Sequence, residues 1–305
     1  MRQFKKFTTI SRPILDEVGI IFNKFDKHPV NNHSFFKFLL NESYDRGLTT
    51  GQYNVFRNNF LFFYQYNLPS AAHVVINAVM RGDHETIATA SRIIMDEGGA
   101  GDPSKVHSNL LLQCINLQGF HIFGLQNITF QDAEKSPLLL PAAKEFRQNQ
   151  LKVYKSPCYM NSIATICAHE GRADGMLEAI KAGIFDPFKG YYTQEDFEKV
   201  EEFFKAHRDD EIDGGDIEAQ HREMTMKMAA RACGGKRSYL TKLEDVGINF
   251  LNHQAQLWGQ MEKSMVEARE NGIAIPPIHE LKPNSQVNDP ECQELGRQSL
   301  PSNIR

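Results

Sequence analysis

Apolar residues recur at helical spacing along almost the whole chain, and this periodicity restricts the fold more than any other feature of the sequence. The clearest example is GQYNVFRNNFLFFYQYN, whose helical face carries Tyr53, Phe56, Phe60, Phe63 and Tyr64. The alternation of apolar and polar residues that would indicate strands is hard to find. We therefore expect an all-α protein.

Capping and breaking residues divide this pattern into separate helices. A helix is expected after Thr49-Thr50, and another over residues 83–97. The segment 123–141 is expected to be a connection, whereas residues 216–270 form one long helical pattern. Residues 273–305 are polar and contain prolines, so we expect a loosely ordered C-terminal tail after a helical domain that covers residues 1–272.

The composition excludes several classes of partner. The 305 residues carry a net charge of -4 without a basic face, so no nucleic acid is expected. No apolar run reaches about 18 residues, so no membrane span is expected either. The five cysteines form no CxxC pair, which favours a reducing, cytoplasmic setting. A small-molecule substrate is the expected partner, and a homodimer is left open.

A turn with the sequence MDEGGAGDPSKVHSNLL places two potential metal ligands near each other. An apolar run ends just before Glu97, and glycines follow. Asp102 and Pro103 are typical of the cap and first turn of a new helix, which carries His107 into an apolar segment. Glu97 and His107 are therefore either surface residues near a turn or side chains that point into one cavity.

A third potential ligand, Glu170, lies on the apolar face of a predicted helix. Three, four and seven positions before it stand Cys167, Ile166 and Ile163. A lone buried carboxylate costs several kcal/mol unless it is paired, protonated or bound to a cation. The alternative is that Glu170 forms the solvated edge of the apolar stripe.

The stretch VEEFFKAHRDDEIDGGDIEAQHREM adds two histidines and further acids. His207 follows apolar residues at steps of three or four, and Glu211 comes one turn later. The row continues through Glu218 and His221, although two glycines can break the helix and Asp216 could cap its continuation. Glu218 and His221 have the ExxH spacing of di-iron bundles, which need two copies, whereas this chain has one.

Each of these side chains could have a structural role in place of metal binding. An isolated histidine is more often a hydrogen-bonded core residue, and a charged run is usually solvated. Together, however, they place carboxylates and imidazoles on the apolar faces of three separated helices. Such a set without a thiolate favours iron or manganese over structural zinc. The sequence therefore predicts a metal cluster inside a bundle, with enough donors for two ions.

The order of these motifs resembles the haem-oxygenase-like di-iron oxidases and oxygenases, iron-containing redox enzymes related to the TenA and PqqC proteins. The resemblance covers roughly residues 12–265. It rests on EGGAGDPSKVH, on ATICAHE, and on FFKAH with an acid four residues later. It implies a single haem-oxygenase-like bundle of about seven helices with the site in its interior.

The resemblance also implies a set of metal ligands in a fixed order along the chain. The order is glutamate, histidine, glutamate, histidine, an acid and a final histidine. The residues that match the first five positions are Glu97, His107, Glu170, His207 and Glu211.

The sixth position departs from the family pattern. Gly214 stands where the last histidine is expected, and His221 follows two turns later on the same face. Asp216 and Glu218 compete with Glu211 for the role of the acid. Either the Gly-Gly stretch lets His221 reach the site, or the second metal site is incomplete.

By resemblance, two Fe(II) ions would activate O2, with the second ion labile in the resting enzyme. The implied reactions are N-oxygenation, oxidative C–C or C–N cleavage, and decarboxylation of amino-acid-derived or fatty-acid-like molecules. One alternative is a metal-free TenA- or PqqC-like enzyme, which Gly214 favours. Another is a non-catalytic binding protein in which the acids and histidines form a satisfied polar network.

Substrate-binding residues are sought among the polar side chains that precede Glu170. Lys152, Tyr154, Lys155 and Tyr159 lie roughly three to five helical turns before it. Lys152 and Tyr159 are predicted to bind a substrate carboxylate. The alternative is that the lysines lie on the surface and the tyrosines pack in the core or an interface.

Overall fold

The computed structural model describes residues 12–170, 173–208 and 217–269, and within this part every regular element is helical. The all-α prediction is confirmed. The predicted C-terminal tail, residues 273–305, lies outside the described residues.

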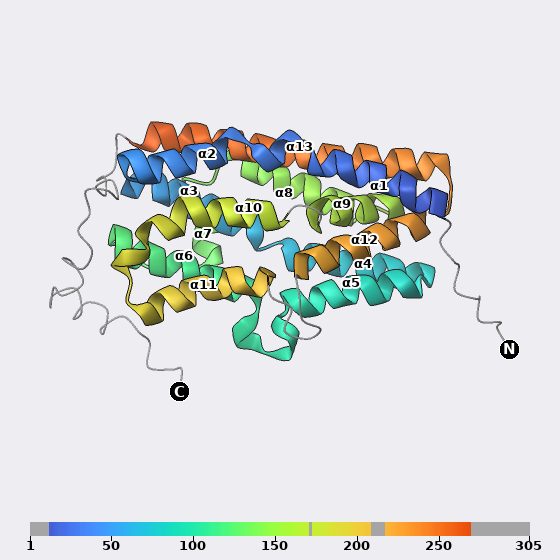
Figure 1. The fold of residues 1–305 in the computed structure, drawn as a ribbon, viewed down its shortest axis with the longest axis horizontal. Helices are drawn as coiled ribbons and strands as arrows, with labels where there is room; N and C mark the ends of the chain where they lie inside the picture. The colour runs from blue at the N-terminus through green and yellow to red at the C-terminus, as the bar shows by residue number, and fades with distance from the viewer. Residues whose placement is uncertain (1–11, 171–172, 209–216, 270–305) are drawn as a thin grey trace.

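Most helices run roughly along the long axis of the molecule and lie side by side (Figure 1). The α-helices are α1 (Arg12–Asp26), α2 (Ser34–Asn41), α3 (Thr50–Tyr64), α4 (Asn67–Arg81), α5 (His84–Glu97), α6 (His107–Phe123), α7 (Phe130–Lys135), α8 (Pro141–Tyr154), α9 (Tyr159–Glu170), α10 (Ala173–Ile180), α11 (Gln194–Arg208), α12 (Ile217–Cys233) and α13 (Arg237–Ala268). Short 3-10 helices lie at η1 (Pro29–Asn32), η3 (Gly99–Gly101), η4 (Pro103–Lys105) and η6 (Asp186–Tyr191), and π-helical turns at η2 (Glu42–Arg46) and η5 (Lys181–Phe185).

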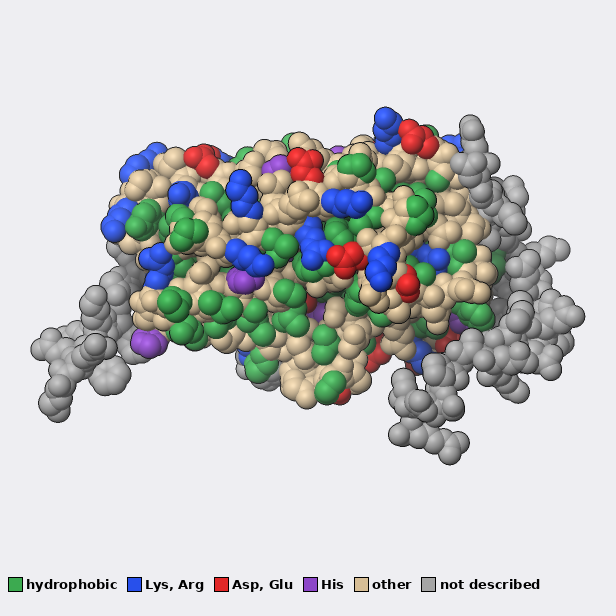
Figure 2. Space-filling view, turned by 180° about the vertical axis from the view of Figure 1, so that it is seen from behind, with side chains coloured by type: hydrophobic (Ala, Val, Ile, Leu, Met, Phe, Trp, Pro, Cys, Tyr) green, Lys and Arg blue, Asp and Glu red, His purple; other side chains and the backbone are tan. Residues whose placement is uncertain are grey.

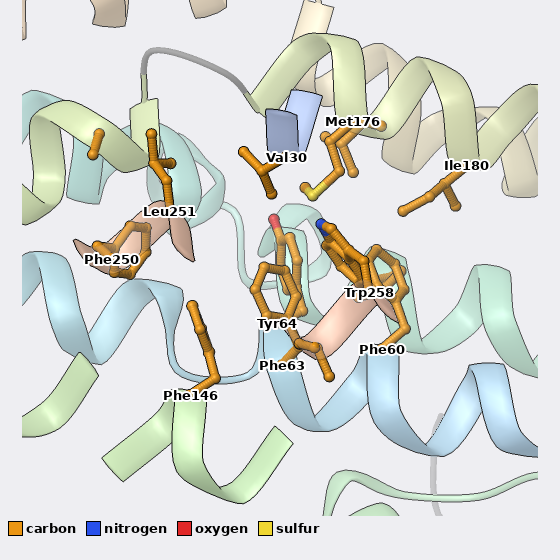
Figure 3. Packing of buried hydrophobic residues seen from close by; sticks show 14 of the residues in the cluster. Val30, Phe60, Phe63, Tyr64, Phe146, Met176, Ile180, Phe250, Leu251 and Trp258 are labelled. Carbon is orange, nitrogen blue, oxygen red and sulfur yellow. The ribbon is translucent and has the colours of Figure 1, made fainter. Parts of the chain in front are cut away.

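The longest helix, α13, extends along one side of the molecule and packs against α9, α3 and α8 (Figure 1). Its Trp258 is completely buried and stacks on Phe35, with ring centroids 5.6 Å apart and planes 4° apart. The Phe63 ring of α3 lies 5.2 Å from the same indole. Figure 3 shows Trp258, Phe60 and Phe63 in this core. Helices from both ends of the sequence therefore share one apolar interior.

The predicted helix starts agree with the capping chemistry of the structure. Thr49 and Gln52 form a capping box at α3, each side chain bonded to the other residue's backbone N–H. Asp83 caps α5, where its Oδ1 accepts from the Thr86 N–H at 3.1 Å. These local interactions satisfy backbone donors that the helix itself leaves unpaired.

Two predicted segments differ from the structure. The connection 123–141 contains α7, whose Thr129 cap and Asp132 form another capping box. The pattern over residues 216–270 is divided into α12 and α13 at Gly234-Gly235, which have φ values of +51° and +74°. An α-helix cannot continue through left-handed residues, so the chain reverses there. Breaks of this kind give the described chain more α-helices than the resemblance implied.

The surface mixes side chains of all kinds on the face that Figure 2 shows, where Lys and Arg alternate with Asp, Glu and apolar residues. Among the described residues, no helix combines the length and the apolar character needed to cross a membrane. The four cysteines in this part of the chain form no disulfide.

Trp258→Ala is expected to lower the free energy of unfolding by about 3–5 kcal/mol, because the cavity it leaves lies inside a close-packed aromatic cluster. Urea denaturation followed by circular dichroism measures this change. Val266→Ala, on the same helix but with Val266 exposed, is the control and should change the free energy by less than about 0.5 kcal/mol. Equal effects of the two substitutions would contradict the assigned core.

Candidate metal centre

Three predicted ligands from three helices meet inside the protein. Glu97 is the last residue of α5, His107 is the first residue of α6, and His207 lies in the last turn of α11. One potential ligand atom from each lies within 4.8 Å of the others. The imidazole centroids are 4.3 Å apart, and both histidines are buried. We call Glu97, His107 and His207 the first cluster.

The backbone between α5 and α6 folds tightly enough to bring Glu97 and His107 together. Gly99 has a φ of +76°, and a Cβ atom there would lie 2.6 Å from the carbonyl carbon of Lys105 and 2.7 Å from the nitrogen of Val106. No side chain can be accommodated at that distance. Glycine at this position is thus what allows the turn to close just before His107.

The start of α6 differs in detail from the prediction. Asp102 and Pro103 do form a cap and a first turn, but that turn is η4, where the Ser104 N–H donates to Asp102 Oδ1 at 2.9 Å. The α-helix begins only at His107. The imidazole therefore projects from the very first residue of α6, next to the end of α5.

Hydrogen bonds fix the tautomer of His207. Its Nδ1 lies 2.8 Å from the carbonyl oxygen of Phe203, which can only accept, so Nδ1 carries the proton. Its Nε2 therefore holds a lone pair and lies 2.8 Å from the Tyr64 hydroxyl. That hydroxyl is also 3.2 Å from Glu97 Oε2, so it can donate to either group. A rotation of the Tyr64 hydroxyl towards Glu97 would free Nε2 to bind a metal ion.

The charges of the first cluster suit cation binding. Burial would raise the pKa of Glu97, but the neighbouring imidazoles, first His107 and then His207, hold it well below its usual value. Burial, together with the nearby His107, lowers the pKa of His207 to about 3. At neutral pH the cluster therefore combines an ionised carboxylate with a neutral His207 imidazole, which are the protonation states that a metal ion requires.

A second group of side chains lies around His221 on α12. Its Nδ1 is 3.1 Å from Glu170 Oε2, and its Nε2 is 2.9 Å from Asp96 Oδ2. Asp96 also accepts two hydrogen bonds from Arg92 Nε, at 3.0 and 2.9 Å. Asp96, Glu170 and His221 are all buried. We call Asp96, Glu170 and His221 the second cluster.

A narrow cavity of about 10 Å³ joins the two clusters, because Glu97 and Glu170 both line it. Its other polar walls come from α4, α8 and α9, and include Asn67, Ser70 and Gln150. The two clusters are also linked through the chain, since Asp96 and Glu97 are consecutive residues of α5. The site thus consists of two groups of donors beside one polar cavity.

The structure also places the remaining predicted ligands. Glu211 and Asp216 lie outside the described residues. The backbone of Glu218 belongs to α12, and its side chain is not among the described parts. His221 is buried beside Glu170, as the prediction of an inward-facing His221 requires. Gly214, which stands where the family has its last histidine, lies outside the described residues.

The predicted substrate-binding residues lie elsewhere. The side chain of Lys152 is exposed, and neither Lys152 nor Tyr159 lines the cavity. The Tyr159 hydroxyl donates to Asp83 Oδ2 at 2.7 Å, so it fastens the turn between α4 and α5. Tyr154, the last residue of α8 and five positions before Tyr159, does line the cavity. Sequence spacing alone did not distinguish these residues, because they lie on two different helices.

Two residues of the site were missed by the sequence reasoning. Asp96 directly precedes Glu97 on α5, so the two carboxylates point in different directions. Asp96 contacts His221 in the second cluster, whereas Glu97 belongs to the first. Tyr64 was assigned to the apolar row of α3, and it is indeed buried, but its hydroxyl reaches the first cluster. A buried tyrosine usually needs a partner for its hydroxyl, and this was the available signal.

The fold can be compared with known proteins. No family model and no curated protein matches the sequence. Among solved structures, the chain is similar to a domain of unknown function with a haem-oxygenase-like fold from Shewanella denitrificans. The two share 18% sequence identity, and the match covers 84% of this chain and 94% of that chain with a TM-score of 0.53. The chain has a haem-oxygenase-like fold. At this identity the comparison establishes the fold, so the activity has to be argued from the site.

The first cluster fits a metal ion on the evidence of its own side chains. The buried Nδ1 of His107 has no hydrogen-bond partner, since its nearest carboxylate oxygen, Glu97 Oε2, is 3.5 Å away. Leaving a buried nitrogen unpaired is costly unless something else binds it. Two imidazoles and one carboxylate are the donor set typical of non-haem Fe(II) sites.

Gly99→Ala is expected to disturb the turn that holds His107 and thereby weaken metal binding at the first cluster. Gly82→Ala is the matched control, because Gly82 also has a positive φ, +65°, but open space around its Cβ position. Gly82→Ala should lower the free energy of unfolding by only about 1–2 kcal/mol, which is the cost of placing alanine in the left-handed conformation. Urea denaturation and iron titration should show a larger loss for Gly99→Ala in both measurements. Equal losses would contradict the proposed close approach.

Proposed function

We propose that this chain is a non-haem iron oxidase or oxygenase, which holds two ferrous ions and uses O2 to oxidise a small organic substrate. The observation that carries the proposal is the first cluster, a partly buried carboxylate with two buried imidazoles, inside a haem-oxygenase-like fold. A carboxylate and two imidazoles from three helix ends have no evident structural need to converge. Burying them without a cation leaves the His107 Nδ1 unsatisfied.

In this proposal Glu97, His107 and His207 hold the first ion. Bound ferrous iron would supply the one-electron chemistry by which O2 reacts with an organic molecule. Phe203 keeps the proton of His207 on Nδ1 and so leaves Nε2 available. Tyr64 can hold or move a proton between its hydroxyl and the Glu97 carboxylate. Burial of the two imidazoles limits their contact with bulk water.

The second ion would be held by Glu170 and His221, with Asp96 as an additional acid. Glu211, Asp216 and Glu218 remain candidates for the same role. Each contact of His221 with a carboxylate contains a proton that a metal ion would displace, so binding of the second ion would release protons. This competition is consistent with a labile second site.

A metal-free enzyme or a binding protein on the same fold is the second candidate, and one specific observation favours it. Both ring nitrogens of His221 already lie within hydrogen-bond distance of carboxylates, so the second cluster is satisfied without a cation. The unpaired His107 nitrogen argues for the first candidate. Metal analysis of the purified protein separates the two.

Iron stoichiometry should respond differently to substitutions in the two clusters. Protein expressed with added iron is expected to hold nearly two irons per chain. His107→Ala should remove the first ion and His221→Ala only the second, as measured by elemental analysis of dialysed protein. His84→Ala is the control, because His84 is exposed at the start of the same helix that carries Glu97. Iron content that none of these substitutions changes would leave only the metal-free candidate.

Exposure of the ferrous protein to O2 should produce an optical transient in stopped-flow measurements. Glu170→Ala should abolish the transient if both ions take part, because it removes a donor from the second cluster. A transient of normal size in Glu170→Ala would restrict the reaction to the first ion. The exposed-residue variant His84→Ala should behave like the natural protein.

A further inference from the structure

The hairpin formed by α4 and α5 carries an exposed apolar surface. On α4, Ile76, Val79 and Met80 are 55%, 56% and 82% exposed, and on α5 Met95 is 42% exposed. Because α4 and α5 pack against each other, these side chains belong to one surface. Figure 2 shows apolar side chains gathered at the lower left, where this hairpin lies. We call this surface the hairpin face, which consists of Ile76, Val79, Met80, Ala88, Ser91 and Met95.

The hairpin face carries no charge. Residues 67–80 include no Asp, Glu, Lys or Arg. Charged side chains of α5 have partners within the subunit, since Glu85 pairs with Arg231 of α12 at 2.7 Å. Arg92 likewise pairs with Asp96 at 2.9 Å. These charges are therefore used inside the subunit, and the exposed stripes of the two helices are neutral.

A neutral surface restricts the kind of partner that can cover it. Helices that bind a membrane surface carry Lys and Arg beside their apolar residues, and a different protein is usually selected by opposite charges. The hairpin face offers neither. His73 is the only titratable side chain in residues 67–80, and burial, with the nearby Lys155, lowers its pKa, so it is neutral at neutral pH. Two copies of this face can therefore meet without opposing like charges.

The size of the hairpin face also fits a subunit interface. α4 has 15 residues and α5 has 14. The pair is therefore about 21 Å long and, at about 10 Å for each helix, about 20 Å wide. The accessible surface of such a face is of the order of the 600–800 Å² per partner that specific interfaces bury. Monomeric proteins rarely leave a larger apolar patch than a few hundred Å² open to water.

We propose that the hairpin face joins two copies of this chain in a dimer with twofold symmetry. In such an interface the same surface meets itself, so Ile76, Val79 and Met80 of each subunit pack against the hairpin of the other. The interface also supports α5, the helix that contributes Asp96 and Glu97 to the two clusters. Dimer formation does not depend on metal binding, so the proposal goes beyond the proposed function.

The experiment is sedimentation velocity of the full-length protein from about 1 to 100 μM, a range that brackets micromolar association. Ile76→Glu places a carboxylate on the hairpin face. Ile20→Glu is the matched control, because Ile20 is the same residue type, is 58% exposed and lies on α1. Both substituted side chains are exposed, so both variants should fold, and circular dichroism should show the same helix content.

The natural protein and Ile20→Glu are expected to sediment as dimers. Ile76→Glu should raise the Kd of the dimer by about 100-fold or more, because association would bury the new carboxylate without a partner in each subunit. Oxidation of Met80 by hydrogen peroxide, followed by peptide mass spectrometry, is the second measurement. Met80 should react more slowly in the natural protein than in Ile76→Glu, since only the dimer covers its thioether.

The proposal is overturned if the natural protein is monomeric over this range, or if Ile76→Glu and Ile20→Glu form equally stable dimers. A monomer that floats with phosphatidylcholine or phosphatidylserine vesicles, but not after Ile76→Glu, would also overturn it and assign the hairpin face to a lipid surface. Iron analysis of the same samples separates this result from the proposed function. A dimer that takes up no iron supports the interface and contradicts the iron enzyme, whereas a monomer with two irons does the reverse.

Discussion

Glu97 carries a negative charge inside the protein at the end of α5, where the helix dipole also disfavours an anion. Burial alone would raise its pKa, but the imidazoles of His107 and His207 reverse that effect. These partners come from α6 and α11, so the charge is stabilised only when the helices are packed. The electrostatics of one carboxylate thus depend on the assembled bundle, and this dependence makes the site a candidate for cation binding.

The second cluster extends this arrangement across the chain. Asp96 and Glu97 are adjacent on α5, yet one contacts His221 of α12 and the other lies beside His107 of α6. Helical geometry turns consecutive side chains by about 100°, so two neighbouring carboxylates can serve two different groups of partners. The glycine-rich turn that follows, with its close approach at Gly99, keeps the start of α6 against the end of α5.

Stability and function make opposite demands on the cavity between the clusters. An apolar lining would stabilise the fold, whereas Ser70 and Gln150 bury polar atoms that have no partner in the protein. The close packing of Trp258 with the aromatic side chains around it stabilises the fold and offsets the destabilisation by these unpaired atoms. Ser70 and Gln150 lie beside the cavity that Glu97 and Glu170 also line.

The sequence by itself determined the helical class, the starts of α3 and α5, and the apolar-face positions of Glu97, His107, Glu170, His207 and His221, because periodicity and caps are local properties of the chain. It could not determine how these faces meet. Only the tertiary structure placed Asp96 and Tyr64 in the site, separated the donors into two clusters, and set Lys152 and Tyr159 apart from the cavity. The physical reason is that hydrogen bonds and ligand geometry depend on distances between helices far apart in sequence, which a local pattern does not contain.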